Sequence, residues 1–259
     1  MSHAERVKNF KHLKSVGHTN VWQIKGSSSH SAFFFEAGIS VDVDGAPNAY
    51  GPTDAIALDN HANAGHPGNW WGVQTDKHGR PIVQHRGPPS QPMAGYYIST
   101  TSLIDASFPE DDVRRFVDAT KIPYLALPPL DLTETGLRLG DLAVVFNARN
   151  GKFCSAIFAD TKKHHVLSEV SARVVDRLGT YGNPKGGPSP ADGIIRIVFP
   201  GSGIGNKVGW PDEHTIDVVG SDFLSILSRH HDKQRTLEKA YSEYPLFATA
   251  LTAAGYGRE

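Results

Sequence analysis

Two acidic residues, Asp160 and Glu169, lie at positions that suit acid/base chemistry. Asp160 follows the apolar run 155–159, and Glu169 comes nine positions later, after a connection of eight residues. The apolar run predicts a strand whose end delivers Asp160 to a site opening, and a helix is expected over 168–179, with Ser168 as its N-cap. Paired carboxyl groups suit hydrolysis, because one can protonate a leaving oxygen while the other deprotonates water. In a purely structural interpretation, Glu169 favours the helix dipole and Asp160 caps a turn.

The surroundings of the two acids predict different roles. The apolar neighbours Ile157, Phe158 and Ala159 would raise the pKa of Asp160, which favours a general acid. The first turn of a helix would lower the pKa of Glu169, which favours a general base. If such a pair acts with inversion, its carboxyl groups should lie about 6.5–9.5 Å apart on one cleft to leave room for water, whereas a separation of about 5 Å would favour retention.

Other acidic and aromatic residues are candidates for binding a substrate. Glu36, Asp42 and Asp44 lie on or near a strand expected over 39–45. Trp70 and Trp71 lie in the irregular segment 46–91, where paired indoles could stack on a flat ligand. Two structural interpretations remain open: Asp42 could bond to neighbouring backbone, and the tryptophans could fix their loop to the core.

The composition excludes several classes of protein. With 259 residues, 39% of them hydrophobic and 20% charged, the chain is neither disordered nor fibrous. Lys and Arg number 26 against 27 for Asp and Glu, which gives a net charge of -1 and predicts no general affinity for nucleic acid or membranes. The single cysteine excludes an internal disulfide and a cysteine-based zinc cluster. The 13 histidines show no metal-ligand spacing, so neither a metal nor another cofactor is expected.

The sequence as written is expected to contain neither a signal peptide nor a membrane span. Residues 1–16 are charged and lack the apolar segment of a signal peptide, and no apolar run reaches the roughly 20 residues of a membrane span. The location of the protein therefore stays open between a cytosolic protein and one whose leader has been removed.

The elements that must position these residues are mainly strands. Gly at 26 and Pro at 17 are typical of a turn-rich, mainly β chain. Besides those already described, strands are expected over 21–24, 32–35, 81–84, 95–100, 124–127, 142–146 and 194–199, and a helix from about Ser221 towards Tyr244. We expect three parts: an N-terminal extension (1–19), a main domain (20–220) and a helical C-terminal extension packed on it (221–259).

Several sequence blocks resemble one enzyme family. The blocks are 33–50 (FFFEAGISVDVDGAPNAY), 95–103 (GYYISTTSL), 122–128 (IPYLALP), 140–147 (GDLAVVFN), 156–160 (AIFAD) and 168–171 (SEVS). In this order, across about residues 20–220, they are similar to glycoside hydrolase family 75, the fungal-type chitosanases. The chain departs from the family pattern at Ser168, where members usually have Gly, and in the basic loop 162–165.

The resemblance implies a fold and an activity. We expect a closed or nearly closed six-stranded barrel decorated by a few peripheral helices, and the resemblance implies that this barrel is of the double-psi type. It also implies endo-hydrolysis of β-1,4-linked glucosamine polymers with inversion, without a cofactor, on chitosan or partially acetylated chito-oligosaccharides. The family's catalytic Asp and Glu match Asp160 and Glu169. Family members are usually secreted.

Two other functions remain open at this level. The same fold could serve as a non-catalytic carbohydrate-binding or cell-wall-associated module, which would bind chitosan without releasing reducing ends. A metal- or nucleotide-dependent cytosolic enzyme would instead purify with a tightly bound metal or phosphate ligand.

Overall fold

A computed structural model describes residues 10–24, 32–85, 89–162, 165–188, 193–203 and 209–230. The main sheet contains β1 (Phe10–Val16), β2 (Thr19–Ile24), β3 (Ala32–Glu36), β4 (Ser40–Asp42), β7 (Tyr124–Leu127), β8 (Leu142–Asn147), β9 (Lys152–Thr161), β10 (Glu169–Ser171) and β11 (Ile194–Phe199). A small hairpin is formed by β5 (Gly65–His66) and β6 (Asn69–Trp70). The helices are α1 (His61–Ala64), α2 (Ala172–Arg177) and α3 (Glu213–His230), with 3-10 turns at Val113–Arg115, Pro129–Asp131 and Thr133–Thr135. The mainly β class is thus confirmed.

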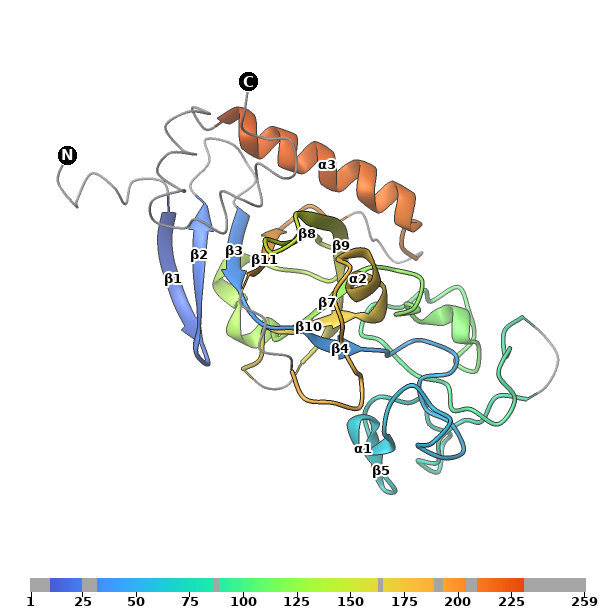
Figure 1. Ribbon diagram of the computed structural model, residues 1–259. Helices are drawn as coiled ribbons and strands as arrows, with labels where there is room; N and C mark the ends of the chain where they lie inside the picture. The colour runs from blue at the N-terminus through green and yellow to red at the C-terminus, as the bar shows by residue number, and fades with distance from the viewer. Residues whose placement is uncertain are drawn as a thin grey trace, which may run out of the picture.

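The main sheet differs from the expected barrel. Its nine strands run in the order β1-β2-β3-β11-β8-β9-β7-β10-β4, so a closed six-stranded barrel is wrong. The sheet is strongly curled (Figure 1), and among the described residues no ladder joins its two ends. The short link between β3 and β4 accounts for the curl. Strand β3 pairs with β11 and strand β4 pairs with β10, so the two strands flank the series β11-β8-β9-β7-β10 on opposite sides. Because only three residues separate β3 from β4, the sheet must curl to bring its two sides together.

Two apolar cores lie on the two faces of the curled sheet. Along β11, Ile194 and Val198 belong to one core, whereas Ile195, Ile197 and Phe199 belong to the other. Strands β8 and β9 alternate in the same way. Because both faces are covered, these strands appear in the sequence as continuous apolar runs rather than as alternating ones.

Arg196 is a fully buried cation within this sheet. Its guanidinium donates hydrogen bonds to the carbonyls of Ala37 (2.9 Å), Gly38 (2.7 Å) and Ser168 (3.0 Å). Burial lowers the pKa of Arg196 to about 9. The side chain therefore ties β11 to the link between β3 and β4 and to the residue that precedes Glu169.

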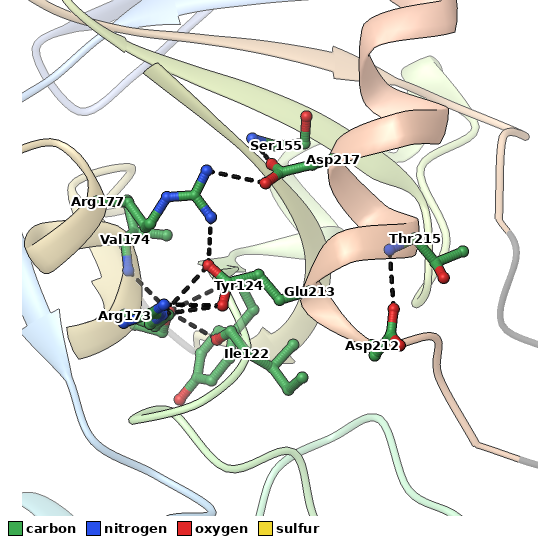
Figure 2. A network of polar contacts seen from close by, with 11 residues as sticks. Ile122, Tyr124, Ser155, Arg173, Val174, Arg177, Asp212, Glu213, Thr215 and Asp217 are labelled. Atoms are coloured by element: carbon green, nitrogen blue, oxygen red, sulfur yellow. Dashed lines mark hydrogen bonds and ion pairs between the residues drawn. The ribbon is translucent and has the colours of Figure 1, made fainter. Parts of the chain in front are cut away.

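Helix α3 covers one face of the sheet, and ion pairs fix it to helix α2 (Figure 2). Glu213 accepts hydrogen bonds from Arg173 and Arg177 of α2. Asp217 pairs with Arg177 at 2.8 Å and accepts the backbone N–H of Ser155 on β9 at 3.2 Å. Although burial would raise it, these arginines hold the pKa of Glu213 below its usual value.

Some expected elements differ from those in the structure. Residues 169–171 form a strand, and the following helix begins only at Ala172, with Ser171 as its N-cap. The segments 81–84 and 95–100 form isolated bridges instead of strands. The two segments do exchange backbone hydrogen bonds, such as those from the Gln84 N–H to the Tyr96 carbonyl and from the Ile98 N–H to the Ile82 carbonyl, but these bonds form no continuous ladder.

The expected domain boundaries also fall inside elements. Strand β1 lies within the segment 1–19 and pairs with β2, and α3 begins at Glu213, before position 221. Positions 1–9 and the expected helix beyond 230 lie outside the described residues. Within the part of the chain that the structure describes, no helix is both long and apolar enough to cross a membrane.

Candidate active site

A pocket of about 570 Å³ opens where β9 ends. Helix α1, the β5–β6 hairpin, the turn after β4, the loop around Thr101 and the end of β9 contribute its walls. The lining residues are Asp44, Ala62, Asn63, Asn69, Trp71, Thr100, Thr101, Ser102, Asp160, Thr161 and Lys162. Of these eleven residues, Ala62 and Trp71 are apolar and the other nine are polar or charged. The pocket therefore suits a hydrophilic ligand.

Asp160 lies at the pocket wall near the end of β9, where the pairing with β7 is irregular. Its Oδ1 accepts hydrogen bonds from both the backbone N–H and the hydroxyl of Ser102, each at 2.7 Å. Burial, followed by the negative charge of Asp42, raises the pKa of Asp160 to about 7. A carboxyl group with this pKa can hold a proton near neutral pH and give it to a leaving oxygen.

Asp42 and Asp44 lie beside Asp160 and are held by their own hydrogen bonds. The backbone N–H of Asp44 donates to Asp42 Oδ1 at 2.8 Å. Asp44 Oδ1 accepts the hydroxyls of Tyr50 (2.8 Å) and Ser99 (3.0 Å). Burial raises the pKa of both aspartates, and in Asp44 the charges of Asp42 and Asp160 raise it further.

The three aspartates form a compact carboxylate cluster. Asp42, Asp44 and Asp160 each place an oxygen within 4.8 Å of the others. Asp42 Oδ2 is buried and has no partner among the described residues. Oxygen donors of this kind suit hard cations or an ammonium group. Because the Lys162 ammonium already lies in the field of Asp42 and Asp44, we do not assign the cluster as metal ligands.

Glu169 projects from the same face of the sheet as Asp160. Strand β7 lies between β9 and β10, and its Ala126 pairs with Asp160 on β9. On the β10 side, Val170 pairs with Leu125 in antiparallel register, so Glu169 is the neighbour of Ala126 there. Paired residues on neighbouring strands share a face, and two strand spacings put the two Cα atoms roughly 9.5 Å apart. The carboxyl separation of about 6.5–9.5 Å stays a prediction.

Lys162 connects Glu169 to the pocket. Its Nζ lies 2.6 Å from Glu169 Oε1, and its side chain is 37% exposed against 11% for Glu169. Lys162 lines the pocket together with Asp160, two residues before it. Glu169 Oε2 is buried and has no hydrogen-bond partner among the described residues.

The physical basis expected for the role of Glu169 is wrong. Glu169 lies in strand β10 and not in the first turn of a helix, so no helix dipole acts on it as predicted. Ser168 likewise caps no helix, and its carbonyl accepts hydrogen bonds from Arg196 and from the N–H of Ser40. The cation at Glu169 is instead a side chain, Lys162.

The remaining candidates separate into two groups. Trp71 is 48% exposed and lines the pocket, and its Nε1 donates to the Asn63 carbonyl at 3.0 Å. Trp70 packs instead on the core, with its ring edge-on to Tyr97. Glu36 does not line the pocket, since it accepts the Gly193 N–H at 2.6 Å at the end of β3.

Sequence reasoning missed several residues of the site. Ser102 donates to Asp160 but lies 58 positions before it in the chain. It follows Thr100 and Thr101 in a run of hydroxyl residues, and this pattern does not indicate a contact with Asp160. Lys162 appears in the sequence only as part of a basic loop, and nothing in the sequence indicates its contact with Glu169. Lys163 and His164 of that loop lie outside the described residues.

No protein-family model matches the chain, and no curated protein matches it.

Proposed function

We propose that the protein is an endo-acting glycoside hydrolase that cleaves β-1,4-linked glucosamine polymers with inversion. The supporting observation is the placement of Asp160 and Glu169 on one face of the sheet, on either side of Ala126. Burial raises the pKa of Asp160 to about 7, which suits a proton donor. Glu169 is paired with the Lys162 ammonium, which favours the ionised carboxylate that a proton acceptor needs. The sequence blocks that resemble glycoside hydrolase family 75 support the same reaction.

In the proposed reaction each carboxyl group handles one proton. Protonated Asp160 gives its proton to the glycosidic oxygen as the bond from that oxygen to the anomeric carbon breaks. A water molecule attacks the anomeric carbon from the opposite face and loses a proton to the Glu169 carboxylate. Solvent then returns a proton to Asp160 and removes one from Glu169, which restores both groups without a cofactor.

The proposed substrate is chitosan or a partially acetylated chito-oligosaccharide. Its amines are ammonium groups, each with hydrogens to donate, and the carboxylate cluster offers acceptors next to the general acid. Trp71 lies half-exposed on the same pocket, where its indole can stack on a sugar ring. The substrate-binding roles proposed for Asp42, Asp44 and Trp71 follow from these positions.

Reducing-end release from chitosans of different acetylation tests the proposal. The wild type should release oligosaccharides, and Asp160→Asn and Glu169→Gln should each lose at least about 100-fold in kcat, as removal of general catalysts does. Glu110→Gln, at an exposed position away from the pocket, is the matched control and should be unchanged. Binding of chitosan without hydrolysis would indicate a carbohydrate-binding module instead.

The roles within the pair are tested with an activated substrate and azide. A good leaving group needs no proton, so it should rescue Asp160→Ala. Azide can replace the activated water, so it should rescue Glu169→Ala. The reverse pattern would exchange the two roles.

A further inference from the structure

Glu169 is held through only one of its two carboxylate oxygens. Oε1 pairs with Lys162 Nζ at 2.6 Å, whereas Oε2 is buried without a partner among the described residues. A buried carboxylate oxygen without a donor costs free energy, so an acceptor left in this state calls for a donor that the protein does not supply. Water is the smallest such donor, and it is also the nucleophile of the proposed reaction.

From this geometry we infer that Lys162 is a positioning residue, which fixes Glu169 through Oε1 and keeps it ionised so that Oε2 receives the attacking water. The inference rests on the proposed function. It extends that function by assigning a task to a residue outside the carboxylate pair and by dividing the two oxygens of Glu169 between anchoring and catalysis. When the water attacks, its proton moves to Oε2 while Lys162 keeps its own proton.

The backbone places Lys162 well for this task. Its N–H bonds to the Leu127 carbonyl at 3.1 Å, which continues the pairing of β9 with β7 just beyond Asp160. The lysine is therefore anchored to the same strand that separates the two acids. Its aliphatic stem and ammonium form part of the pocket wall, so the cation can reach Glu169 without being removed from solvent.

Several other charged or titratable groups surround Glu169. Asp160 on β9 and Asp42 on β4 lie on the same face, as does Tyr124 on β7, and Arg196 on β11 reaches the Ser168 carbonyl. The two aspartates would disfavour a further negative charge, and Arg196 contacts only backbone in this region. Lys162 is the cation that pairs directly with the Glu169 carboxylate in the described part of the chain.

The test combines kinetics with a spectroscopic titration of Lys162→Met, Lys162→Arg and the exposed control Lys77→Met. Chitosan hydrolysis is followed from about pH 4 to about pH 8, a range that spans the ordinary carboxyl pKa and neutrality. In Lys162→Met, kcat should fall by about 10- to 100-fold with KM within about twofold, and the acidic limb of the kcat profile should move to higher pH. Lys162→Arg should restore most of kcat.

Carbon-13 NMR of glutamate-labelled protein gives a readout independent of activity. The Glu169 carboxyl signal, assigned by its loss in Glu169→Gln, should titrate at higher pH in Lys162→Met than in the wild type and Lys77→Met. The inference would be overturned by an unchanged titration, or by a Lys162→Met variant in which KM rises while kcat stays at the wild-type value. If the wild type does not hydrolyse chitosan, the proposed function fails, and the NMR titration alone decides whether Lys162 holds Glu169 ionised.

Discussion

At the scale of single residues, the site depends on carboxyl groups that influence one another. Three aspartates share a partly buried cluster, and each is fixed by donors on one oxygen. Like charges at this distance disfavour simultaneous ionisation, so the cluster holds a proton at a pH where isolated aspartates have lost theirs. Burial together with these like charges is the physical basis for the role of general acid that we propose for Asp160.

Asp42→Asn tests the electrostatic coupling. The substitution keeps an oxygen for the Asp44 N–H but removes the charge that contributes to raising the pKa of Asp160. Because the acid must be protonated to act, activity in the wild type should fall as pH rises through about 7. The alkaline limb of the kcat profile should move to lower pH in Asp42→Asn and stay in place in Glu110→Gln. An unmoved limb would contradict the coupling.

At the scale of elements, a buried side-chain hydroxyl holds the short strand that carries Glu169 in register. Strand β10 has only three residues, yet it pairs with β4 and β7 at once. Ser171 fixes its end, since its hydroxyl donates to the Ile122 carbonyl and accepts the Tyr124 N–H, each at 3.0 Å. The same oxygen caps α2.

Ser171→Ala should therefore destabilise the protein more than an ordinary cap substitution. It removes the cap and leaves a buried N–H and a buried carbonyl without partners, which together should cost about 2–3 kcal/mol of unfolding free energy. Urea unfolding measures the change. The exposed Thr53→Ala is the control and should stay within about 0.5 kcal/mol of the wild type. A cost equal to that control would show that β10 is not fixed through this hydroxyl.

Arg196→Met tests the buried cation that joins the sheet to the residue before Glu169. The carbonyls of Ala37 and Gly38 would lose the guanidinium as a donor, and the Ser168 carbonyl would keep only the Ser40 N–H, so we expect a cost of about 3 kcal/mol or more in urea unfolding. Arg196→Lys should recover part of the loss, since it keeps a donor but not the fork of the guanidinium. Equal stability of Arg196→Met and the wild type would contradict this role.

At the scale of the whole molecule, the individual strands of the sheet can be predicted from the sequence more readily than the order in which they pair. Strands such as β8 and β11 appear as apolar runs because both faces are buried, and periodicity finds such runs. The order of the nine strands depends on long-range pairing, such as β11 between β3 and β8, which local patterns do not encode. The sequence also misled at Glu169, where Ser168 and the following apolar spacing imitate a helix start that tertiary pairing with β4 overrides.

The site shows the same division. Asp160 and Glu169 could be proposed because each adjoins an apolar segment. Asp42 and Asp44 could be proposed because they alternate with apolar residues over 39–45, although β4 itself ends at Asp42. Ser102 and Lys162 could not, since their importance arises from contacts with Asp160 and Glu169 that only the fold creates.

The global stability should carry the signature of the buried carboxyl cluster. The folded pKa of Asp160, about 7, exceeds the ordinary value of 3.8, so its contribution is fully present below about pH 4 and is lost as pH rises through about 7. Asp160→Asn cannot ionise. Its unfolding free energy relative to the wild type should therefore increase between acidic and neutral pH, as measured by urea unfolding at each pH. A difference that does not change with pH would contradict the raised pKa.

Proton NMR of the reducing ends formed from chitosan tests the central claim most directly, because it follows bond cleavage and stereochemistry together. Inverting hydrolysis by Asp160 and Glu169 predicts that the α-anomer appears first and that the β-anomer grows in later by mutarotation. Asp160→Asn should give neither signal on the same timescale. First appearance of the β-anomer, or no new reducing ends with the wild type, would contradict the account.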